Sequence, residues 1–219
     1  MQRVFQSYFE EIDSLKENEW KKFKLRRDYE FDPYSIPSII EHDQLTYLSH
    51  MSKGSLFDIN QHVESTIFAR SEYQQHRPTI LQYSALCGSV RCFRFLLQHH
   101  AKIEITDESA RPLSDFLTIS GHNIITNYLF TLNIPIKSAL HLSIAYHYNE
   151  LFFKLHMEKL DKISMKDKNG YNIMQKAVIS NNLRIFLHLF TTGFKINEGY
   201  VSGNTALHAA AFYGHITIC

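Results

Sequence analysis

Glycine, proline and cysteine are scarce in this sequence, with 8, 5 and 3 copies among 219 residues. A β-sandwich or β-barrel needs many turns, which glycine and proline usually supply, so their scarcity argues against both architectures. Helices joined by short connections fit this composition better. The three cysteines, Cys87, Cys92 and Cys219, are a sparse and odd-numbered set, which is not typical of a disulfide framework.

The sequence also lacks an excess of charge of either sign. Its 23 Lys and Arg against 22 Asp and Glu give a net charge of +1, which predicts no general affinity for nucleic acid or an anionic membrane. No apolar run approaches the ~20 residues that span a bilayer, and the first residues lack the apolar segment of a signal peptide. Together with the cysteine usage, these absences predict a soluble protein of the cytoplasm, with the nucleus as the alternative.

A motif near the C-terminus recurs along the chain. Residues 203–208 read Gly-Asn-Thr-Ala-Leu-His, and residues 209–215 read Ala-Ala-Ala-Phe-Tyr-Gly-His. Stepping back 33 residues from Gly203 reaches Gly170, and Gly88 and Gly121 are also 33 residues apart. A fixed period of this length is typical of repeat proteins, whereas an ordinary helical bundle predicts none.

Residues 203–215 resemble the repeat of the ankyrin family. The resemblance implies an all-α fold, an ankyrin-repeat solenoid of stacked helix–turn–helix units, with about five units over residues 77–219, the last one truncated. Residues 79–93 and the segment Asp58-Ile59-Asn60, expected to be strand-like, are similar to a divergent ankyrin family expanded in unicellular eukaryotes. Each unit has two short helices that cannot bury their apolar faces alone, so neighbouring units must stack.

The residue types at the turns agree with this interpretation. A residue whose side-chain oxygen can cap a helix opens the units at Thr79, Ser138, Asn172 and Thr205. Glycine, which tolerates a left-handed backbone, separates the two helices at Gly88, Gly121 and Gly214, and His147 and Asn181 replace it in the remaining units. The connection near residues 131–138 is expected to be shortened, because His147 follows Gly121 by only 26 residues.

The first third of the chain carries no consensus unit. Residues 1–37 are expected to form a helical N-terminal region, and residues 38–76 a degenerate capping repeat. The basic run 21–27 could be a nuclear-import or phosphate-binding patch. Because residues 1–30 hold seven basic and seven acidic side chains, a solvated helix face is the favoured interpretation, and nucleic acid is not an expected partner.

No motif for chemistry is recognisable, so the chain is not expected to be an enzyme or to carry a cofactor. His141 and His208 occupy the histidine position of the ankyrin pattern, which implies a structural hydrogen bond. The other repeat histidines, including His156 and His188, are not expected to converge. The spacing of Cys87 and Cys92 matches no common zinc site.

The resemblance implies a monomeric scaffold or adaptor that binds a protein partner through its fingertip turns and inner-helix face. The fingertip positions are Lys168, Asn169, Tyr171, Val201, Ser202 and Asn204, and the inner-helix positions are Tyr146, Ser180, Phe212 and Tyr213. The alternative for Phe212 is that it only packs against its neighbours. Cys219 falls inside the expected second helix of the last unit, so the chain is expected to be a fragment. The alternative function is therefore a targeting module of a larger protein, whose missing C-terminal part could be catalytic.

Overall fold

The computed structural model describes residues 32–64, 71–132, 134–135, 137–158, 166–167, 169–197 and 203–218. These residues form helices and turns and contain no strand. Most of the expected N-terminal region 1–37, and the basic run 21–27, lie outside this description. The chain divides into two compact units, one up to Phe116 and the other from Leu117.

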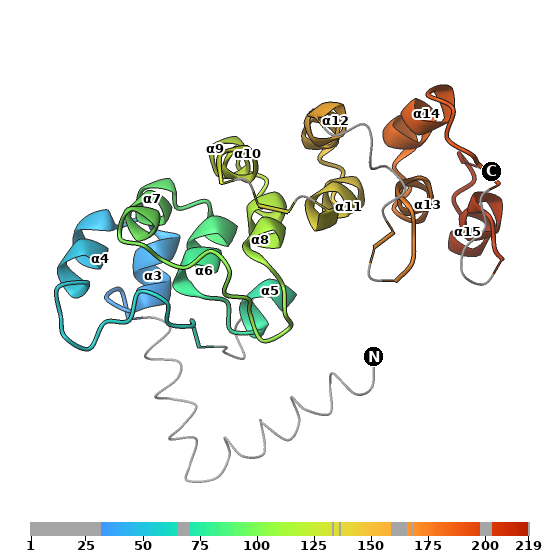
Figure 1. The fold of residues 1–219 in the computed structure, drawn as a ribbon. Helices are drawn as coiled ribbons and strands as arrows, with labels where there is room; N and C mark the ends of the chain where they lie inside the picture. Colours follow the sequence, from blue (N-terminus) through green and yellow to red (C-terminus); the bar gives the residue numbers. More distant parts are fainter. Residues whose placement is uncertain are drawn as a thin grey trace, which may run out of the picture. The chain divides into compact units, whose positions relative to one another are not determined.

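The first unit contains two helix pairs that lie side by side (Figure 1). Its helices are α3 (Ile36–Glu41), α4 (Leu45–Met51), α5 (Glu72–Gln75), α6 (Ile80–Cys87), α7 (Val90–Gln98) and the start of α8 (Leu113–Ile119). Helix α3 packs on α6, and α4 packs on α7. Ile40, Leu48 and Phe93 are fully buried between the pairs, so the first pair occupies the place of a repeat next to the second.

The expected strand-like finger at Asp58–Asn60 is wrong, because this segment forms a turn. The carboxylate of Asp58 accepts a hydrogen bond from the Asn60 N–H at 2.9 Å, and the Asn60 side chain accepts one from the Lys102 N–H at 2.8 Å. A short Asp side chain that bonds two residues ahead stabilises a turn rather than a strand.

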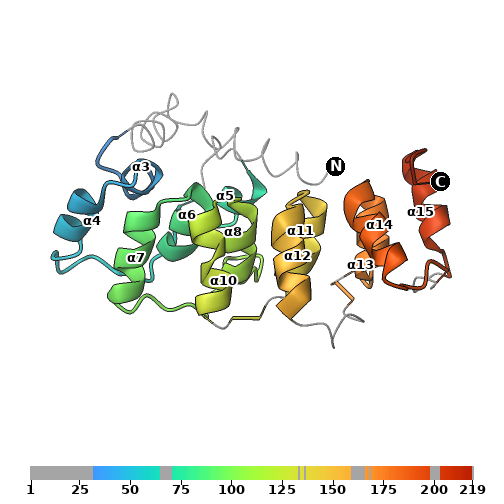
Figure 2. The ribbon, with the colours of Figure 1, turned by 90° about the horizontal axis from the view of Figure 1, so that it is seen from above.

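The second unit repeats the same arrangement (Figures 1 and 2). Its helices are α9 (Asn123–Thr126), α10 (Tyr128–Thr131), α11 (Lys137–Ala145), α12 (Asn149–Glu158), α13 (Ile173–Ile179), α14 (Leu183–Thr191) and α15 (Ala206–Tyr213). Helix α13 packs between α11 and α15, while α12 covers α11 and α14 covers α13. Ile144, Phe152 and Ile185 have no exposed surface in this core, so burial between neighbours stabilises helices too short to persist alone.

Capping side chains fix where the inner helices begin. The Thr79 hydroxyl accepts from the Gln82 N–H at 3.2 Å, and the Gln82 side chain accepts from the Thr79 N–H at 2.8 Å. Asn172 and Gln175 exchange the same two bonds at 2.8 and 2.9 Å. These caps confirm two of the sequence predictions. The predicted cap at Ser138 is wrong, because α11 already begins at Lys137 and Ser138 lies inside it.

A left-handed residue separates the two helices of each pair in the described part of the chain, and another ends α15. Gly88, Gly121 and Gly214 have φ angles of 75°, 66° and 70°, and His147 and Asn181 adopt 59° and 52° in their place. These angles confirm the predicted substitutions. The same conformation occurs between α3 and α4, where Asp43 has a φ of 49°, although the sequence carries no consensus motif there.

At four of the left-handed positions, the next residue ties its repeat to the one before. Its side chain donates to a backbone carbonyl near the end of the preceding inner helix, where intrahelical partners are missing. This bond occurs at four places: from Ser89 to the Ile40 carbonyl, from Tyr148 to Ile119 (3.1 Å), from Asn182 to Ile144 (3.1 Å) and from His215 to Ile179 (3.1 Å). Each bond joins helix pairs within one unit.

Candidate functional site

The inner helices of the second unit carry a row of equivalent positions at their C-terminal ends. Tyr146, Ser180 and Tyr213 each stand one residue before a left-handed position. Because α11, α13 and α15 pack side by side, the three positions follow one another at the usual helix separation of about 8–10 Å. The structure therefore brings the predicted inner-helix residues together on neighbouring helices.

The aromatic side chains of this row are exposed. Phe212 is 83% exposed, Tyr213 49% and Tyr146 44%. The Phe212 and Tyr213 rings meet edge to face at 5.1 Å, and Tyr146 stacks on Tyr148 at 6.1 Å. Within the described residues the Phe212 ring is not buried by a neighbouring repeat, and its role in binding stays a prediction.

Histidines hold the backbone beneath the row. Nε2 of His147 donates to the Ser180 carbonyl at 2.8 Å, and Nε2 of His215 donates to the Ile179 carbonyl at 3.1 Å. The Ser180 side chain is half-buried, so this position contributes a small, fixed surface between two aromatic ones. A surface fixed before binding loses little conformational entropy when a partner docks.

Three of the predicted fingertip residues, Asn169, Tyr171 and Asn204, are described and lie in the connections before α13 and α15. Asp167 accepts from the N–H groups of Asn169 (2.8 Å) and Tyr171 (2.9 Å), which closes a tight turn around Gly170. Asn169 and Asn204 are exposed, and Tyr171 is half-buried. Lys168, Val201 and Ser202 lie outside the described residues, so their place on a fingertip stays a prediction.

The first unit has a turn of the same construction. The Asp107 carboxylate accepts from the N–H groups of Ser109 (3.0 Å) and Arg111 (2.8 Å), as Asp167 does for its own turn. Ala110 takes the place of Gly170 with a φ of 57°. The repeat pattern therefore extends to this turn without its glycine.

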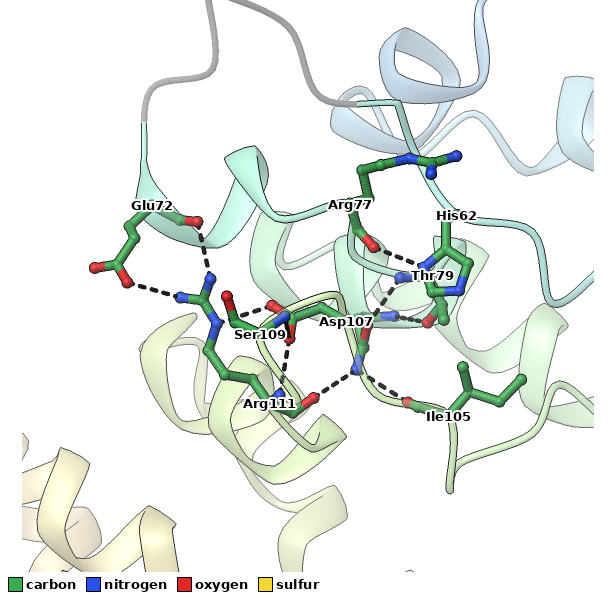
Figure 3. A network of polar contacts seen from close by, with 9 residues as sticks. His62, Glu72, Arg77, Thr79, Ile105, Asp107, Ser109 and Arg111 are labelled. Atoms are coloured by element: carbon green, nitrogen blue, oxygen red, sulfur yellow. Dashed lines mark hydrogen bonds and ion pairs between the residues drawn. The ribbon is translucent and has the colours of Figure 1, made fainter. Parts of the chain in front are cut away.

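A buried ion pair anchors this turn (Figure 3). The Nε of Arg111 donates to Asp107 at 2.8 Å, and its guanidinium lies over the Tyr73 ring at 4.3 Å. Arg111 also contacts the Glu72 carboxylate at 3.5 Å and donates to the Glu72 carbonyl at 3.1 Å. The guanidinium of Arg111 is therefore paired with Asp107 and Glu72 and is not available to a ligand. These contacts hold α5 against the turn.

The comparisons with known proteins agree with this geometry. Residues 140–219 match the family model described as ankyrin repeats (3 copies). This chain has the ankyrin-repeat fold. No curated protein sequence matches the chain significantly.

Similar solved structures include three with TM-scores between 0.59 and 0.64. One is a chain from the complex of the predatory endopeptidase Bd0816 of Bdellovibrio bacteriovorus with the immunity protein Bd3460 (TM-score 0.64, 14% identity, 82% of this chain and 91% of that one). Another is the human ASB11 ankyrin repeat domain (0.61, 17%, 83% and 81%). The third is an ankyrin repeat domain, ABAYE2397, from Acinetobacter baumannii AYE (0.59, 18%, 85% and 95%). At these identities the likeness concerns the fold alone.

Helix α15 exposes an apolar position that other inner helices bury, and a second apolar side chain is exposed after it. Leu207 is 59% exposed, whereas its equivalents Leu81, Leu140 and Met174 are 2%, 8% and 1% exposed. Ile216 is 86% exposed in the turn after α15. Sequence reasoning missed both residues, because a consensus position predicts burial; comparing equivalent positions in the structure reveals the difference.

His141 and His208, at the histidine position of the ankyrin pattern, and the two described cysteines lie in surroundings that do not make them reactive. The ring of His208 bonds to Thr205 at the start of α15, and His141 is buried. Burial raises the pKa of the Cys87 and Cys92 thiols to about 12 each, so both stay protonated at neutral pH. Within the described ranges, no three His, Cys, Asp or Glu side chains gather in a group that could hold a metal ion, and no helix is long and apolar enough to cross a membrane.

Proposed function

We propose that this chain is a protein-recognition module that binds a partner through the aromatic row Tyr146, Ser180, Phe212 and Tyr213, and that it performs no chemistry itself. Ankyrin repeats generally mediate protein–protein interaction. Asn169, Tyr171 and Asn204 are assigned to the rim of the proposed surface, and the fingertip prediction for Lys168, Val201 and Ser202 would add them to it. In this role the chain acts as a scaffold or adaptor.

The proposal rests on the exposure of three aromatic rings at the ends of α11 and α15, on either side of Ser180 at the end of α13. Burying an aromatic side chain removes 150–250 Å² from water, so leaving Phe212 at 83% exposure forgoes a large stabilisation. Aromatic residues are also the types that most often dominate binding energy at interfaces. No row residue carries a formal charge at pH 7, so binding is expected to depend little on salt.

The test compares two matched variants of the whole chain. One replaces the row aromatics (Tyr146→Ser, Phe212→Ser and Tyr213→Ser), and the other replaces the exposed pair Tyr34→Ser and Tyr47→Ser on the first unit, which are 60% and 46% exposed. Both keep the buried core, so circular dichroism should show the same helix content as the parent chain. Partners captured by the parent chain are expected to be lost from the first variant and kept by the second.

Affinity measured with one captured partner gives the decisive result. Each row aromatic is expected to change the dissociation constant about tenfold or more, since a hot-spot residue contributes more than about 1 kcal/mol. Unchanged affinity for the row variant, or equal losses in both variants, would show that the binding surface lies elsewhere.

A further inference from the structure

Helices α12 and α14 are the outer helices of neighbouring repeats in the second unit (Figure 1), and a histidine of one contacts a histidine of the other. The rings of His156 on α12 and His188 on α14 lie 5.4 Å apart at an angle of 80°. The expectation that the repeat histidines do not converge is wrong for this pair. Phenylalanine rings surround it: Phe152 stacks on His156 at 5.3 Å, and Phe153 meets His188 edge to face at 4.9 Å.

Both imidazoles have a buried nitrogen without a partner. His156 is 4% exposed, and Nε2 of each ring has no hydrogen-bond partner among the described residues. A neutral ring loses one hydrogen bond with water in such a place, whereas a protonated ring would be a buried, unpaired cation, which is far more costly. The surroundings therefore favour a neutral His156 ring.

The charged groups on the surrounding elements do not offset the positive charge that a protonated His156 ring would carry. Glu150 pairs with Arg184 at 2.9 Å, and Arg184 lies over the Phe153 ring. Lys154 donates to Asn127 at 2.9 Å. The remaining titratable or charged side chains on these elements are His141 on α11, Lys176 on α13, Lys195 after α14, and Lys137 and Glu158, whose side chains lie outside the described part. No ion pair within that part reaches either histidine.

We propose that His156, packed against His188, makes the joint between the helix pairs α11–α12 and α13–α14 acid-sensitive, so that protonation of the His156 ring loosens the contact between these two repeats. Tyr146 and Ser180 stand on the same two pairs. Loosening this joint would therefore disturb the row to which the proposed function assigns binding. The acid sensitivity itself does not depend on that function.

The sign follows from the neutral folded state. Burial lowers the pKa of His156, and the nearby His188 lowers it further. The unfolded chain then binds more protons than the folded chain below about pH 6.5, so stability falls as the pH drops from there toward the folded pKa. If the unfolded chain binds one proton more than the folded chain, the unfolding equilibrium constant rises at most about tenfold for each unit by which the pH falls.

Hydrogen exchange of the full chain at pH 7.5 and 5.5 tests the proposal. After correction for the intrinsic exchange rate, amides of α12 and α14 are expected to exchange faster at pH 5.5, while those of α6 and α7 change little. The variant His156→Phe, His188→Leu should lose this difference. His122→Gln, which changes an exposed histidine of the same unit, should keep it.

An NMR titration of the parent chain covers the case in which the double variant does not fold. The His156 ring is then expected to titrate below the ordinary value of about 6.5. A His156 pKa at or above this value would overturn the proposal. So would equal acceleration in α6 and α7, or a pH effect that persists in the folded double variant. None of these measurements involves a binding partner. If the proposed binding surface is wrong, they still test the acid sensitivity by itself.

Discussion

Asp43 supplies the N-terminal cap of a helix that lies far along the chain. Its carboxylate accepts from the N–H groups of Cys92 at 2.9 Å and Arg91 at 3.2 Å, in the first turn of α7. Ser89, which stands at the ordinary capping position, directs its hydroxyl to the Ile40 carbonyl instead. Asp43 therefore satisfies helix donors that would otherwise lack a partner, and places a negative charge at the positive end of the helix dipole.

Replacing Asp43 by glycine is expected to lower the free energy of unfolding by about 1–3 kcal/mol. A lost cap costs about 1–2 kcal/mol. The contact of Asp43 with Arg91 adds less than about 1 kcal/mol, because the Arg91 side chain is 65% exposed. Glycine keeps the left-handed backbone without strain, so the loss reports the carboxylate. Asp43→Asn should lose less, since its amide oxygen can still accept one N–H.

The effect has a defined pH dependence. Burial raises the pKa of the Asp43 carboxyl, but the N–H groups of Cys92 and Arg91 that donate to it bring the pKa below its ordinary value. A depressed pKa means that the carboxylate's contribution is complete above about pH 4 and is lost as the pH falls through the folded pKa. Urea denaturation followed by circular dichroism between pH 7 and 3 should therefore show the difference between the parent chain and Asp43→Gly narrowing below pH 4. A difference under about 0.5 kcal/mol at pH 7, or one that stays constant to pH 3, would refute the reasoning.

Two further substitutions test the ties between repeats and the strained turns. Asn182→Ala should lower the free energy of unfolding by about 2–4 kcal/mol. The Asn182 amide is only 1% exposed, and it donates to Ile144 and Asn149 and accepts from the Ile185 N–H. Urea denaturation measures this loss, and a loss below about 1 kcal/mol would contradict the assigned bonds. His100→Gly should raise the free energy of unfolding by about 0.5–1 kcal/mol, since exposed His100 has a φ of 63° and glycine removes that strain at some cost in unfolded-state entropy. The same change at the adjacent right-handed His99 (φ −95°) should destabilise the chain, and equal effects at both positions would count against the backbone argument.

The repeat period predicts the fold because the left-handed turns recur at fixed places. Gly121 and Gly214 indicate their turns by residue type. His147 and Asn181 are identified as turn residues by counting repeat positions along the sequence. The turn at Asp43 could not be found in this way, since no consensus motif surrounds it. Its identity depends on a contact with α7, which the local sequence does not contain.

The candidate site was predictable only in part for a related reason. Equivalent positions place Tyr146 and Tyr213 in one row, and exposure then shows that no described neighbour buries Phe212. His156 and His188 escape this procedure because they are not equivalent: one follows its left-handed residue by nine positions and the other by seven. Two different positions of neighbouring repeats meet only when the helices are docked.

The ties between repeats explain how the ankyrin fold persists where its consensus fades. The four side chains that reach back to the preceding inner helix are Ser89, Tyr148, Asn182 and His215. They differ in size and share only the ability to donate a hydrogen bond at one place, directly after the left-handed residue. A carbonyl at a helix end needs a donor and not a particular residue, so donors of different length can substitute for one another while the backbone adjusts slightly. The family match begins at residue 140, yet the bond from Ser89 to Ile40 has the same form. The hydrogen bond that joins neighbouring repeats therefore also occurs in a part of this chain that the family's sequence pattern does not cover.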